Sequence, residues 1–405
     1  MLQQITLNNF RSIENESLDL GKITVLTGAN NSGKSSFLYA LMVLKNLMQN
    51  ANRQLDEVLT PFYINLGGFD EMIFRRETQR MMKIGVKIDA DTTYPPNGFK
   101  AKTNVAFDLE CNRTKALTRI AANPSYGLET NINFPVNVSN FTAIPNPDNQ
   151  RKMFVWNGLF AHAIDSALKV DKEIRLFLEF MTPYSFFQTS VDFVPIQRGF
   201  SQFVYSDIPI NENIYTEKEL AVLLARDRKL EAKVSYYLGK IVNKSFSVLP
   251  LVPSYGSFRL QVCDLETGFV NDLVNEGYGI GQLVVILTKA LRPDIRLVCI
   301  DEPEIHLHPS MIDKLVTVMI EICEKERKQF LLSTHSENLV TALMTNVEEK
   351  NIAADDVKVY FLKKEKDTTK LEYQPINEHG QIKGGLKNFY ESELNNLKKL
   401  FNITE

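Results

Sequence analysis

The feature that most constrains this chain is a glycine-rich segment close to its N-terminus, which reads GANNSGKS from Gly28 to Ser35. A short apolar run, Ile23 to Leu26, comes directly before it, and a segment with apolar residues at helical spacing follows. The spacing G-x-x-x-x-G-K-S between a strand and a helix is that of a phosphate-binding loop. An ordinary glycine- and serine-rich turn is the alternative, but such a turn requires neither flanking element. The segment therefore predicts a nucleotide-binding site.

The residue types in this loop each suit a role towards phosphate. Glycine lets the backbone curl until its N–H groups point at phosphate oxygens, and the positive end of the following helix points at the same anion. Lys34 is expected to reach the β- and γ-phosphates, and the Ser35 hydroxyl to coordinate Mg²⁺. The residues expected to contact the nucleotide are Gly28, Asn30, Asn31, Ser32, Gly33, Lys34, Ser35 and Ser36.

A second motif, RLVCIDEPEIHLHP, begins at Arg296. Its apolar residues predict a buried strand over 296–300 that carries Asp301 and Glu302 to the carboxyl edge of a parallel sheet, where ligands bind. Asp301 is expected to hold Mg²⁺, directly or through water, and Glu302 to orient or activate the attacking water. A strand that simply ends in a capping acidic residue is the alternative, and the loop upstream disfavours it.

A third segment, QFLLSTHSEN, predicts another core strand that ends in polar residues, with His335 directly after it. His335 is expected to donate a hydrogen bond to the γ-phosphate, although a histidine at a strand end is more often structural. A zinc site made with His306 and His308 is disfavoured, because no cysteine joins them and the two lie two residues apart beside a proline.

A fourth segment, NEGYGIGQL, places Gly277, Gly279 and Gly281 before a helix predicted to begin near Gln282. An exposed helix N-terminus suits a second phosphate contact, and a helix cap is the plainer alternative.

The remaining pattern predicts an α/β fold with a mainly parallel core sheet, because strands and helices alternate at both ends of the chain. Antiparallel strands are expected over 81–110, an irregular surface segment over 121–150, and helices over 157–182 and 216–245. The predicted division is an N-terminal lobe over 1–80, an insertion with a β arm and helical segments over 81–254, and a C-terminal lobe over 255–405.

Composition removes several classes of protein. The formal charge of −3 over 405 residues argues against binding nucleic acid through overall charge alone. No apolar run approaches the roughly 18–20 residues of a membrane span, so no membrane partner is expected. The N-terminus lacks the pattern of a secretory signal, and the four cysteines have no paired spacing. A cytoplasmic location is expected.

With these four segments in this order, the chain resembles the ABC-type ATPases of the SMC/RecF/OLD group. ITLNNFRSIENESLDLGKITVLTGANNSGKSS is similar to that group's opening strand and Walker A motif, RLVCIDEPEIHLHP to its Walker B motif, and LLSTHSENL to its His switch. NEGYGIGQL is similar to the ABC signature of OLD-like ATPases. The long separation between the Walker motifs lacks coiled-coil heptads, which favours a compact head over a rod.

The resemblance implies ATP and Mg²⁺ as cofactors and a head-to-head dimer or higher even oligomer. Each ATP would be held by the Walker residues of one subunit and capped by Gly279, Gly281 and Gln282 of the other. The signature lacks the usual serine, and Gln197 is the candidate for the Q-loop glutamine. OLD nucleases continue into an acidic Toprim domain, which this sequence lacks, so the chain is not expected to be a nuclease by itself.

Three functions remain open on the sequence. The first is an ATPase switch that controls a separately encoded effector, such as a nuclease in an anti-phage defence system. The second is a RecF-like ATPase that binds DNA in repair through two basic clusters. Their residues are Arg75, Arg76 and Arg80 in the first and Arg226, Arg228 and Lys229 in the second. The third is a scaffold that binds ATP with little turnover.

Overall fold

The computed structural model describes most of residues 1–382. The residues outside the description are 62, 95–97, 123–125, 137–140, 146–150, 165–167, 169–170, 211–212, 253–255 and 383–405. Within the described part, no helix is both long enough and apolar enough to cross a membrane.

A six-stranded sheet forms the centre of the molecule, in the order β11-β16-β17-β3-β18-β19. The first five strands run parallel, and β19 closes the edge as an antiparallel hairpin with β18. Strands β3, β16 and β17 are buried along their whole length, as continuous apolar runs predict for a sheet covered on both faces. The bounds are β3 Ile23–Thr27, β11 Val191–Val194, β16 Leu297–Asp301, β17 Gln329–Thr334, β18 Val357–Glu365 and β19 Thr368–Tyr373.

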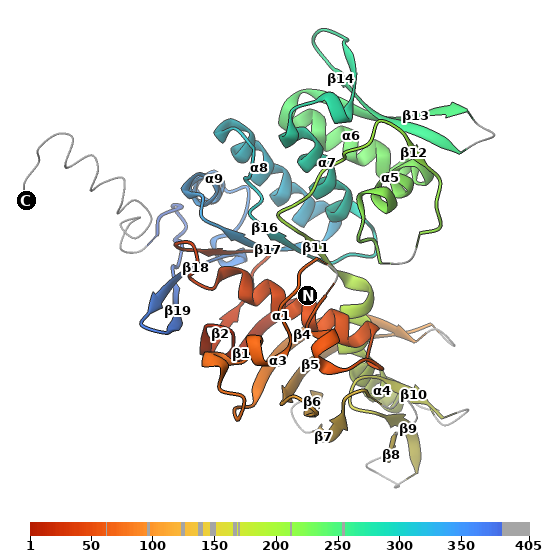
Figure 1. Ribbon diagram of the computed structural model, residues 1–405, viewed down its shortest axis with the longest axis vertical. Helices are drawn as coiled ribbons and strands as arrows, with labels where there is room; N and C mark the ends of the chain where they lie inside the picture. The colour runs from red at the N-terminus through yellow and green to blue at the C-terminus, as the bar shows by residue number, and fades with distance from the viewer. Residues whose placement is uncertain are drawn as a thin grey trace, which may run out of the picture.

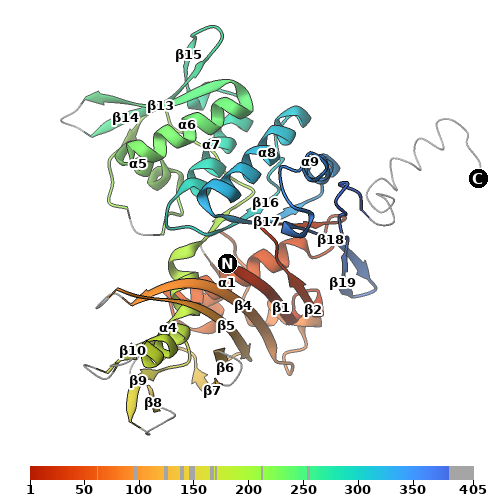
Figure 2. The ribbon, with the colours of Figure 1, turned by 180° about the vertical axis from the view of Figure 1, so that it is seen from behind.

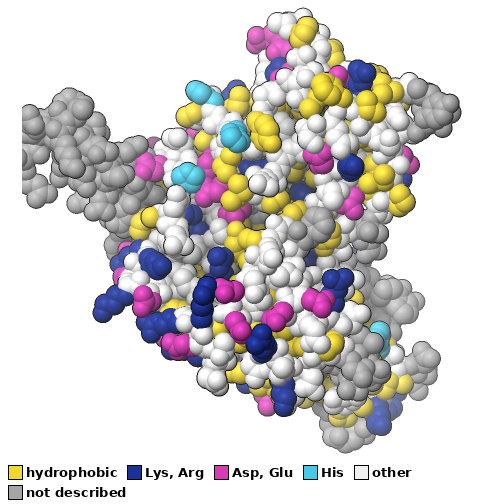
Figure 3. Space-filling model, in the orientation of Figure 1, with side chains coloured by type: hydrophobic (Ala, Val, Ile, Leu, Met, Phe, Trp, Pro, Cys, Tyr) yellow, Lys and Arg dark blue, Asp and Glu magenta, His cyan; other side chains and the backbone are white. Residues whose placement is uncertain are grey.

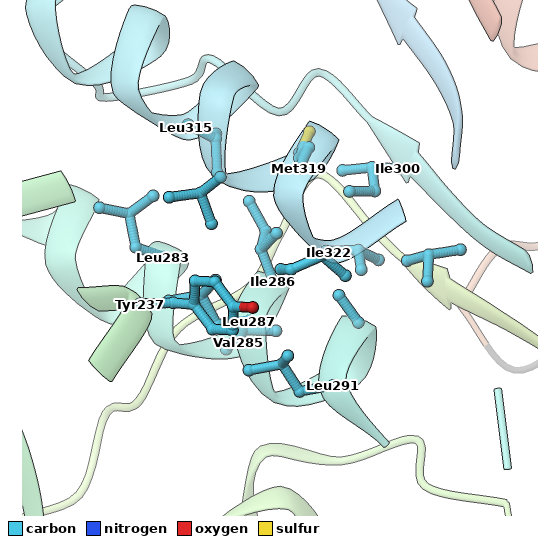
Figure 4. Close-up of a cluster of buried hydrophobic side chains, with 14 of the residues drawn as sticks. Tyr237, Leu283, Val285, Ile286, Leu287, Leu291, Ile300, Leu315, Met319 and Ile322 are labelled. Carbon is cyan, nitrogen blue, oxygen red and sulfur yellow. The ribbon is translucent and has the colours of Figure 1, made fainter. Parts of the chain in front are cut away.

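Helices cover one face of this sheet, in the half that carries α5 to α9 in Figures 1 and 2. Their apolar sides meet the sheet in a single core, part of which lies between α7, α8 and β16 (Figure 4). There Ile286 and Leu287 of α7 lie with Leu315 and Met319 of α8. The bounds are α5 Glu217–Arg226, α6 Arg228–Val242, α7 Tyr278–Leu291, α8 Pro309–Glu326 and α9 Glu337–Glu348.

Helix α1, Lys34–Gln49, covers the opposite face and lies between the central sheet and a second, antiparallel sheet. This second sheet has the order β2-β1-β4-β5-β6-β7, so strands from 1–80 pair with strands from the insertion. Apolar side chains of α1 pack on both sheets in one core. The bounds are β1 Leu2–Phe10, β2 Ile13–Asp19, β4 Met82–Tyr94, β5 Phe99–Cys111, β6 Lys115–Ala122 and β7 Tyr126–Asn133.

Smaller elements complete the described chain. Strands β8 Thr142–Pro145, β9 Lys152–Trp156 and β10 Ala161–Ala163 form a small sheet, with α4 Asp171–Ser185 packed against β5. Strands β12 Tyr205–Ser206, β13 Lys244–Val252, β14 Ser257–Asp264 and β15 Val270–Asp272 form another. The short helices are α2 Leu55–Val58, α3 Phe69–Met72, η1 Phe74–Arg76, η2 Phe186–Ser190, η4 Leu273–Asn275 and η5 Ala354–Asp356.

The mainly parallel sheet and the antiparallel strands over 81–110 are confirmed. The irregular segment expected over 121–150 is wrong for its described part, which contains β7 and β8. Strand β7 reads YGLETNIN and exposes alternate residues, and its partner β6 supplies the pairing that its polar composition hides. The helix expected over 157–182 is wrong in its first half, because β10 precedes α4.

The helix expected over 216–245 is two helices. Asp227 ends α5 and caps α6, where its carboxylate accepts hydrogen bonds from the N–H groups of Lys229 and Leu230. Helix α7 begins at Tyr278 instead of near Gln282, so Gly279 and Gly281 lie inside its first turn and Gly277 is the cap. The last strand of the described chain is β19, Thr368–Tyr373.

Candidate active site

The loop between β3 and α1 has the curled backbone that its glycines allow. Gly28, Asn31 and Gly33 have φ angles of 141°, 65° and 98°. A Cβ atom on Gly28 would lie 2.2 Å from the carbonyl oxygen of Leu362 in β18. One on Gly33 would lie 2.6 Å from Oγ1 of Thr369 in β19. Both glycines are therefore required by conformation and by the close approach of the β18–β19 hairpin.

Thr369 holds the loop from outside the motif. Its buried hydroxyl donates to the carbonyl of Ser32 at 2.9 Å, and its Oγ1 lies 2.7 Å from Oγ of Ser12 in the β1–β2 turn. The N–H of Thr369 also donates to the carbonyl of Ser12 at 2.7 Å. Neither Thr369 nor Ser12 was predicted from the sequence. Each lies outside the four motifs, so no pattern around it indicates a contact with the loop.

The Lys34 ammonium lies folded over its own loop. Nζ donates to the carbonyls of Gly28 at 2.9 Å and Ala29 at 3.1 Å. Burial lowers the pKa of Lys34, and the carboxylates of the acidic motif oppose this shift. Among the other predicted contacts, Asn30 and Asn31 are exposed, and Ser32 and Ser36 are buried. The loop therefore combines exposed residues with one lysine ammonium at its own carbonyls, which suits an anion.

Ser35 and Asp301 meet, as the sequence predicts. The Ser35 hydroxyl donates to Oδ1 of Asp301 at 3.0 Å, and Ser333 of β17 donates to the same oxygen. The Tyr39 hydroxyl donates to Oδ2 at 3.2 Å. An aspartate and a serine hydroxyl at the end of buried strands form an all-oxygen set, which fits the preference of Mg²⁺.

Glu302 and His335 also meet, at the carboxyl ends of β16 and β17. Nδ1 of the His335 ring lies 2.5 Å from Oε2 of Glu302, and the backbone N–H of His335 donates to the same oxygen at 3.3 Å. The Glu302 backbone has φ of 49° and its N–H donates to the carbonyl of Ser333, which turns the carboxylate towards His335. Burial, with the nearby Glu304 carboxyl, raises the pKa of Glu302 to about 7. A carboxylate near neutrality is suited to proton transfer at physiological pH.

Arg198 fixes the backbone of the acidic motif. Its guanidinium donates to the carbonyls of Pro195 and Asp301, both at 2.9 Å, and to that of Glu302 at 2.7 Å. Burial lowers the pKa of Arg198 to about 10, against the attraction of the three acidic side chains. The sequence places Arg198 only beside Gln197, whose side chain is exposed. The positioning role of Arg198 was missed, because backbone carbonyls leave no mark in a sequence.

The signature segment lies at the start of α7, next to the loop that follows Glu302. A Cβ atom on Gly279 would lie 2.6 Å from the carbonyl oxygen of His306, and the rings of Tyr278 and His306 lie 5.4 Å apart. Tyr278 is 71% exposed, whereas Gly281 is buried and Gln282 is 1% exposed. The first turn of α7 therefore presents Gly277 and Tyr278 at the surface, and the Gln282 side chain faces inward.

A cavity of about 560 Å³ lies beside this helix. It is lined by residues that include Gln197, Arg198, Tyr278, Gly281 and Lys289. Both the segment that follows β11 and helix α7, which carries the signature glycines, therefore line this cavity.

The arginines of the predicted basic clusters carry nearby acidic partners. Arg80 pairs with Glu14 at 3.1 Å and with Glu77 at 2.5 Å. The other pairs are Arg75 with Asp367, Arg76 with Glu71, Arg226 with Asp207, and Arg228 with Glu231. These pairs reduce the positive potential that a phosphate backbone would meet.

The chain is similar to two curated proteins at low identity. It is 24% identical over 366 residues to a protein named OLD nuclease from Thermus scotoductus, over 83% of this chain and 59% of that protein. It is 21% identical over 386 residues to a protein named ATP/GTP phosphatase from Helicobacter pylori, over 90% of this chain and 93% of that protein. The chain thus spans less than two thirds of the length of the OLD nuclease.

Solved structures with a similar course of the chain include two SMC head domains. The head domain from Thermotoga maritima aligns with a TM-score of 0.44 and 11% identity, over 92% of this chain and 98% of that chain. An SMC head bound to the C-winged helix domain of ScpA aligns with a TM-score of 0.48 and 11% identity, over 93% and 98%.

A family model described as "AAA domain, putative AbiEii toxin, Type IV TA system" matches residues 23–341. The match runs from β3 through the glycine-rich loop, the acidic motif and His335 into α9. It covers most of the chain, and the relation to an OLD nuclease agrees with the resemblance seen in the motifs. The chain belongs to this family of AAA domains.

Proposed function

We propose that this chain binds ATP with Mg²⁺, hydrolyses it, and uses the reaction as a switch that controls a separate effector protein. The observation that carries the proposal is the convergence of three motifs at the carboxyl ends of adjacent strands. Ser35 meets Asp301, and Glu302 meets His335, although these residues are far apart in the sequence. Ligands bind at this edge of parallel sheets.

In the proposed mechanism, Lys34 leaves the carbonyls of Gly28 and Ala29 and pairs with the β- and γ-phosphates. Ser35 and Asp301 hold Mg²⁺, which supplies positive charge to the phosphate oxygens when bound. Glu302 accepts a proton from the attacking water, and its pKa near neutrality suits this exchange. His335, freed from Glu302, donates a hydrogen bond to the γ-phosphate.

The switch is proposed to act through a head-to-head dimer or a higher even oligomer. The exposed first turn of α7, with Gly277 and the 71% exposed Tyr278, is offered as the surface that caps the partner's nucleotide. Backbone N–H groups at a helix N-terminus suit this role towards phosphate. Because Gln282 is buried, it is proposed to support this turn from within instead of touching the nucleotide.

The effector is proposed to be a nuclease or a toxin-like protein encoded separately, in an anti-phage defence system. The names of the family and of the OLD nuclease relative support this class. ATP binding would then change how the heads associate, and the association would change the effector.

Hydrolysis is tested by steady-state phosphate release from the purified full chain. We expect Mg²⁺-dependent turnover that Lys34→Ala abolishes through loss of ATP binding. Glu302→Gln should retain ATP binding and lose turnover by at least 100-fold. Lys22→Ala is the matched control, because Lys22 forms surface pairs with Glu324 and Asp356 and should turn over as the unaltered chain does. Turnover unaffected by Lys34→Ala would contradict the proposal, and absent turnover with tight ATP binding would favour the scaffold.

The switch is tested by the mass of the Glu302→Gln chain with and without ATP, measured by light scattering. The proposal expects association that needs ATP, and co-purification of a neighbouring gene product in the ATP-bound state. A chain that stays monomeric with ATP bound would overturn the dimer.

DNA binding is the second candidate, and the acidic partners of the described arginines count against it. Duplex binding that weakens with salt and strengthens with ATP would restore it.

A further inference from the structure

Three potential metal ligands gather at one edge of the site, outside the Ser35–Asp301 pair. Glu302, Glu304 and His335 each offer one ligand atom, and these atoms all lie within 4.8 Å of one another. His335 Nδ1 lies 2.5 Å from Glu302 Oε2 and 3.7 Å from Glu304 Oε1. In Figure 3, histidine and acidic side chains lie side by side on one flank of the helical half.

Glu304 supplies an independent reason to look for a cation. Its side chain is only 8% exposed. Oε1 accepts a hydrogen bond from the Thr334 hydroxyl, while the buried Oε2 has no hydrogen-bond partner among the described residues. A buried carboxylate oxygen without a donor carries a desolvation penalty, which a bound cation removes.

The neighbouring cations do not reach this oxygen. Lys34 and Arg198 attract the carboxylates through space, but Nζ of Lys34 and the two terminal nitrogens of Arg198 donate to backbone carbonyls. The Nε atom of Arg198 is buried and donates to none of the described residues. Glu302 and Glu304 place two carboxylates next to each other with the His335 ring beside both, and this leaves room in the charge balance for a divalent ion.

The ligand set also restricts the kind of ion. One imidazole with two carboxylates suits Zn²⁺ and its neighbours in the first transition row better than Mg²⁺, which takes oxygen ligands. Ligand bonds of about 2.0–2.1 Å in a tetrahedral site place two ligand atoms roughly 3.3 Å apart. The 2.5 Å pair is closer than this and the 3.7 Å pair is wider, so a shift of the exposed His335 ring by less than about 1 Å satisfies both.

We propose that Glu302, Glu304 and His335 form a binding site for a divalent transition-metal ion, with solvent as the fourth ligand. Three protein ligands and one open position are the arrangement of an accessible zinc site. The site differs from the Mg²⁺ site at Ser35 and Asp301 in its residues and in its use of nitrogen.

Its effect on hydrolysis rests on the proposed function. An ion held there occupies the carboxylate of Glu302 and the ring nitrogen of His335 that lies nearest to it. It therefore inhibits turnover without displacing Lys34 or Ser35 from the nucleotide.

The test is a calorimetric titration of the nucleotide-free full chain with Zn²⁺. We expect one site that is weakened at least tenfold in Glu304→Gln and in His335→Gln. His308→Gln is the control, because His308 is an exposed histidine bound to Ser310 on the same flank, and it should bind Zn²⁺ as the unaltered chain does. Equal affinity in all four proteins, or loss of the site only in His308→Gln, would overturn the proposal.

A measurement on the unaltered chain guards against variants that fail to fold. X-ray absorption at the zinc edge should show one imidazole nitrogen among oxygen ligands, and a shell with two or more imidazoles would contradict the site. Because binding is measured without nucleotide, a chain that binds Zn²⁺ and lacks ATPase activity would remove the proposed function and leave the metal site standing.

Discussion

The hydroxyl of Ser35 donates to Oδ1 of Asp301 at 3.0 Å, across 266 residues of sequence. Ser35 lies in the first turn of α1 and Asp301 ends β16, with β17 between β16 and β3 in the sheet. Ser333 at the end of β17 donates to the same oxygen. The Asp301 carboxylate therefore links three elements, so a small shift of α1, β16 or β17 would move the proposed metal-binding pair.

Thr369→Val should weaken ATP binding without a direct contact to nucleotide. The substitution keeps the shape of the side chain but leaves the carbonyl of Ser32 without its donor at a buried place. A lost hydrogen bond of this kind costs about 1–3 kcal/mol, so we expect the ATP dissociation constant to rise at least about fivefold. Equilibrium binding of a fluorescent ATP analogue measures it. Thr368→Val is the control, since its hydroxyl makes only a 3.5 Å contact with a neighbouring carbonyl. Equal affinities in both variants would show that the loop needs no clamp.

Arg198→Met should separate turnover from binding. The guanidinium holds the carbonyls of Asp301 and Glu302, and the methionine fills similar volume without donors. We expect kcat to fall at least tenfold while the ATP dissociation constant changes less than about threefold. The free energy of unfolding should fall by about 2–4 kcal/mol, as charged hydrogen bonds to buried carbonyls are lost. Arg259→Met removes a partly buried pair with Asp272 that lies outside the acidic motif, and it should leave kcat unchanged. If the Arg198→Met chain had a normal kcat, Arg198 would not be the residue that positions Glu302 for turnover.

Gly279→Ala and Gly277→Ala should behave differently although they lie two residues apart. A methyl group on Gly279 meets the carbonyl of His306 at 2.6 Å, whereas one on Gly277 meets nothing within 4 Å. We expect Gly279→Ala to lower the free energy of unfolding by about 1–3 kcal/mol through overpacking. Gly277→Ala should change it by less than about 0.5 kcal/mol. Urea unfolding followed by circular dichroism compares them. Equal destabilisation would mean that the turn, and not its contact with the 302–308 loop, is the sensitive feature.

Lys45 should make stability depend on alkaline pH. Its ammonium is buried near Asp192, Lys289 and Arg292, and burial lowers its pKa to about 8. The unfolded chain keeps the proton up to the ordinary pKa of about 10.4, so between these values the unfolded state binds more protons and stability rises with pH. From pH 7 to 9.5 this residue contributes a gain of about 2 kcal/mol.

Urea midpoints at several pH values measure this gain. Lys45→Met should remove it while the contributions of other groups remain. Lys22→Met, at a half-buried lysine paired with Glu324, should retain it. An unchanged pH slope in Lys45→Met would show that Lys45 keeps its proton in the fold.

Much of the site was predictable because its motifs are contiguous. The run from Gly28 to Ser35 contains both the bend and the chemistry, and a parallel sheet brings Asp301 and His335 to the same edge. The partners that hold these motifs were not predictable. Thr369 and Arg198 act on carbonyl oxygens, which every residue carries, so no residue pattern marks the positions that they contact.

The secondary structure failed where local pattern and tertiary pairing differ. Strand β7 is mostly polar and exposed, so only its pairing with β6 reveals it. Helix α7 begins on glycines, which are poor helix formers, because Gly279 permits the close approach to His306. In both cases contacts from distant residues outweigh propensity.

The position of Thr369 in the sequence has a consequence for folding during translation. The loop at Ser32 is synthesised early, but its clamp emerges 337 residues later. Strand β3 likewise waits for both of its neighbours, β17 and β18. At about 5–20 residues per second, this delay lasts roughly 20–70 s. A nascent chain therefore carries the glycine-rich loop without its clamp until Thr369 has been synthesised, and only then can the loop reach its final conformation.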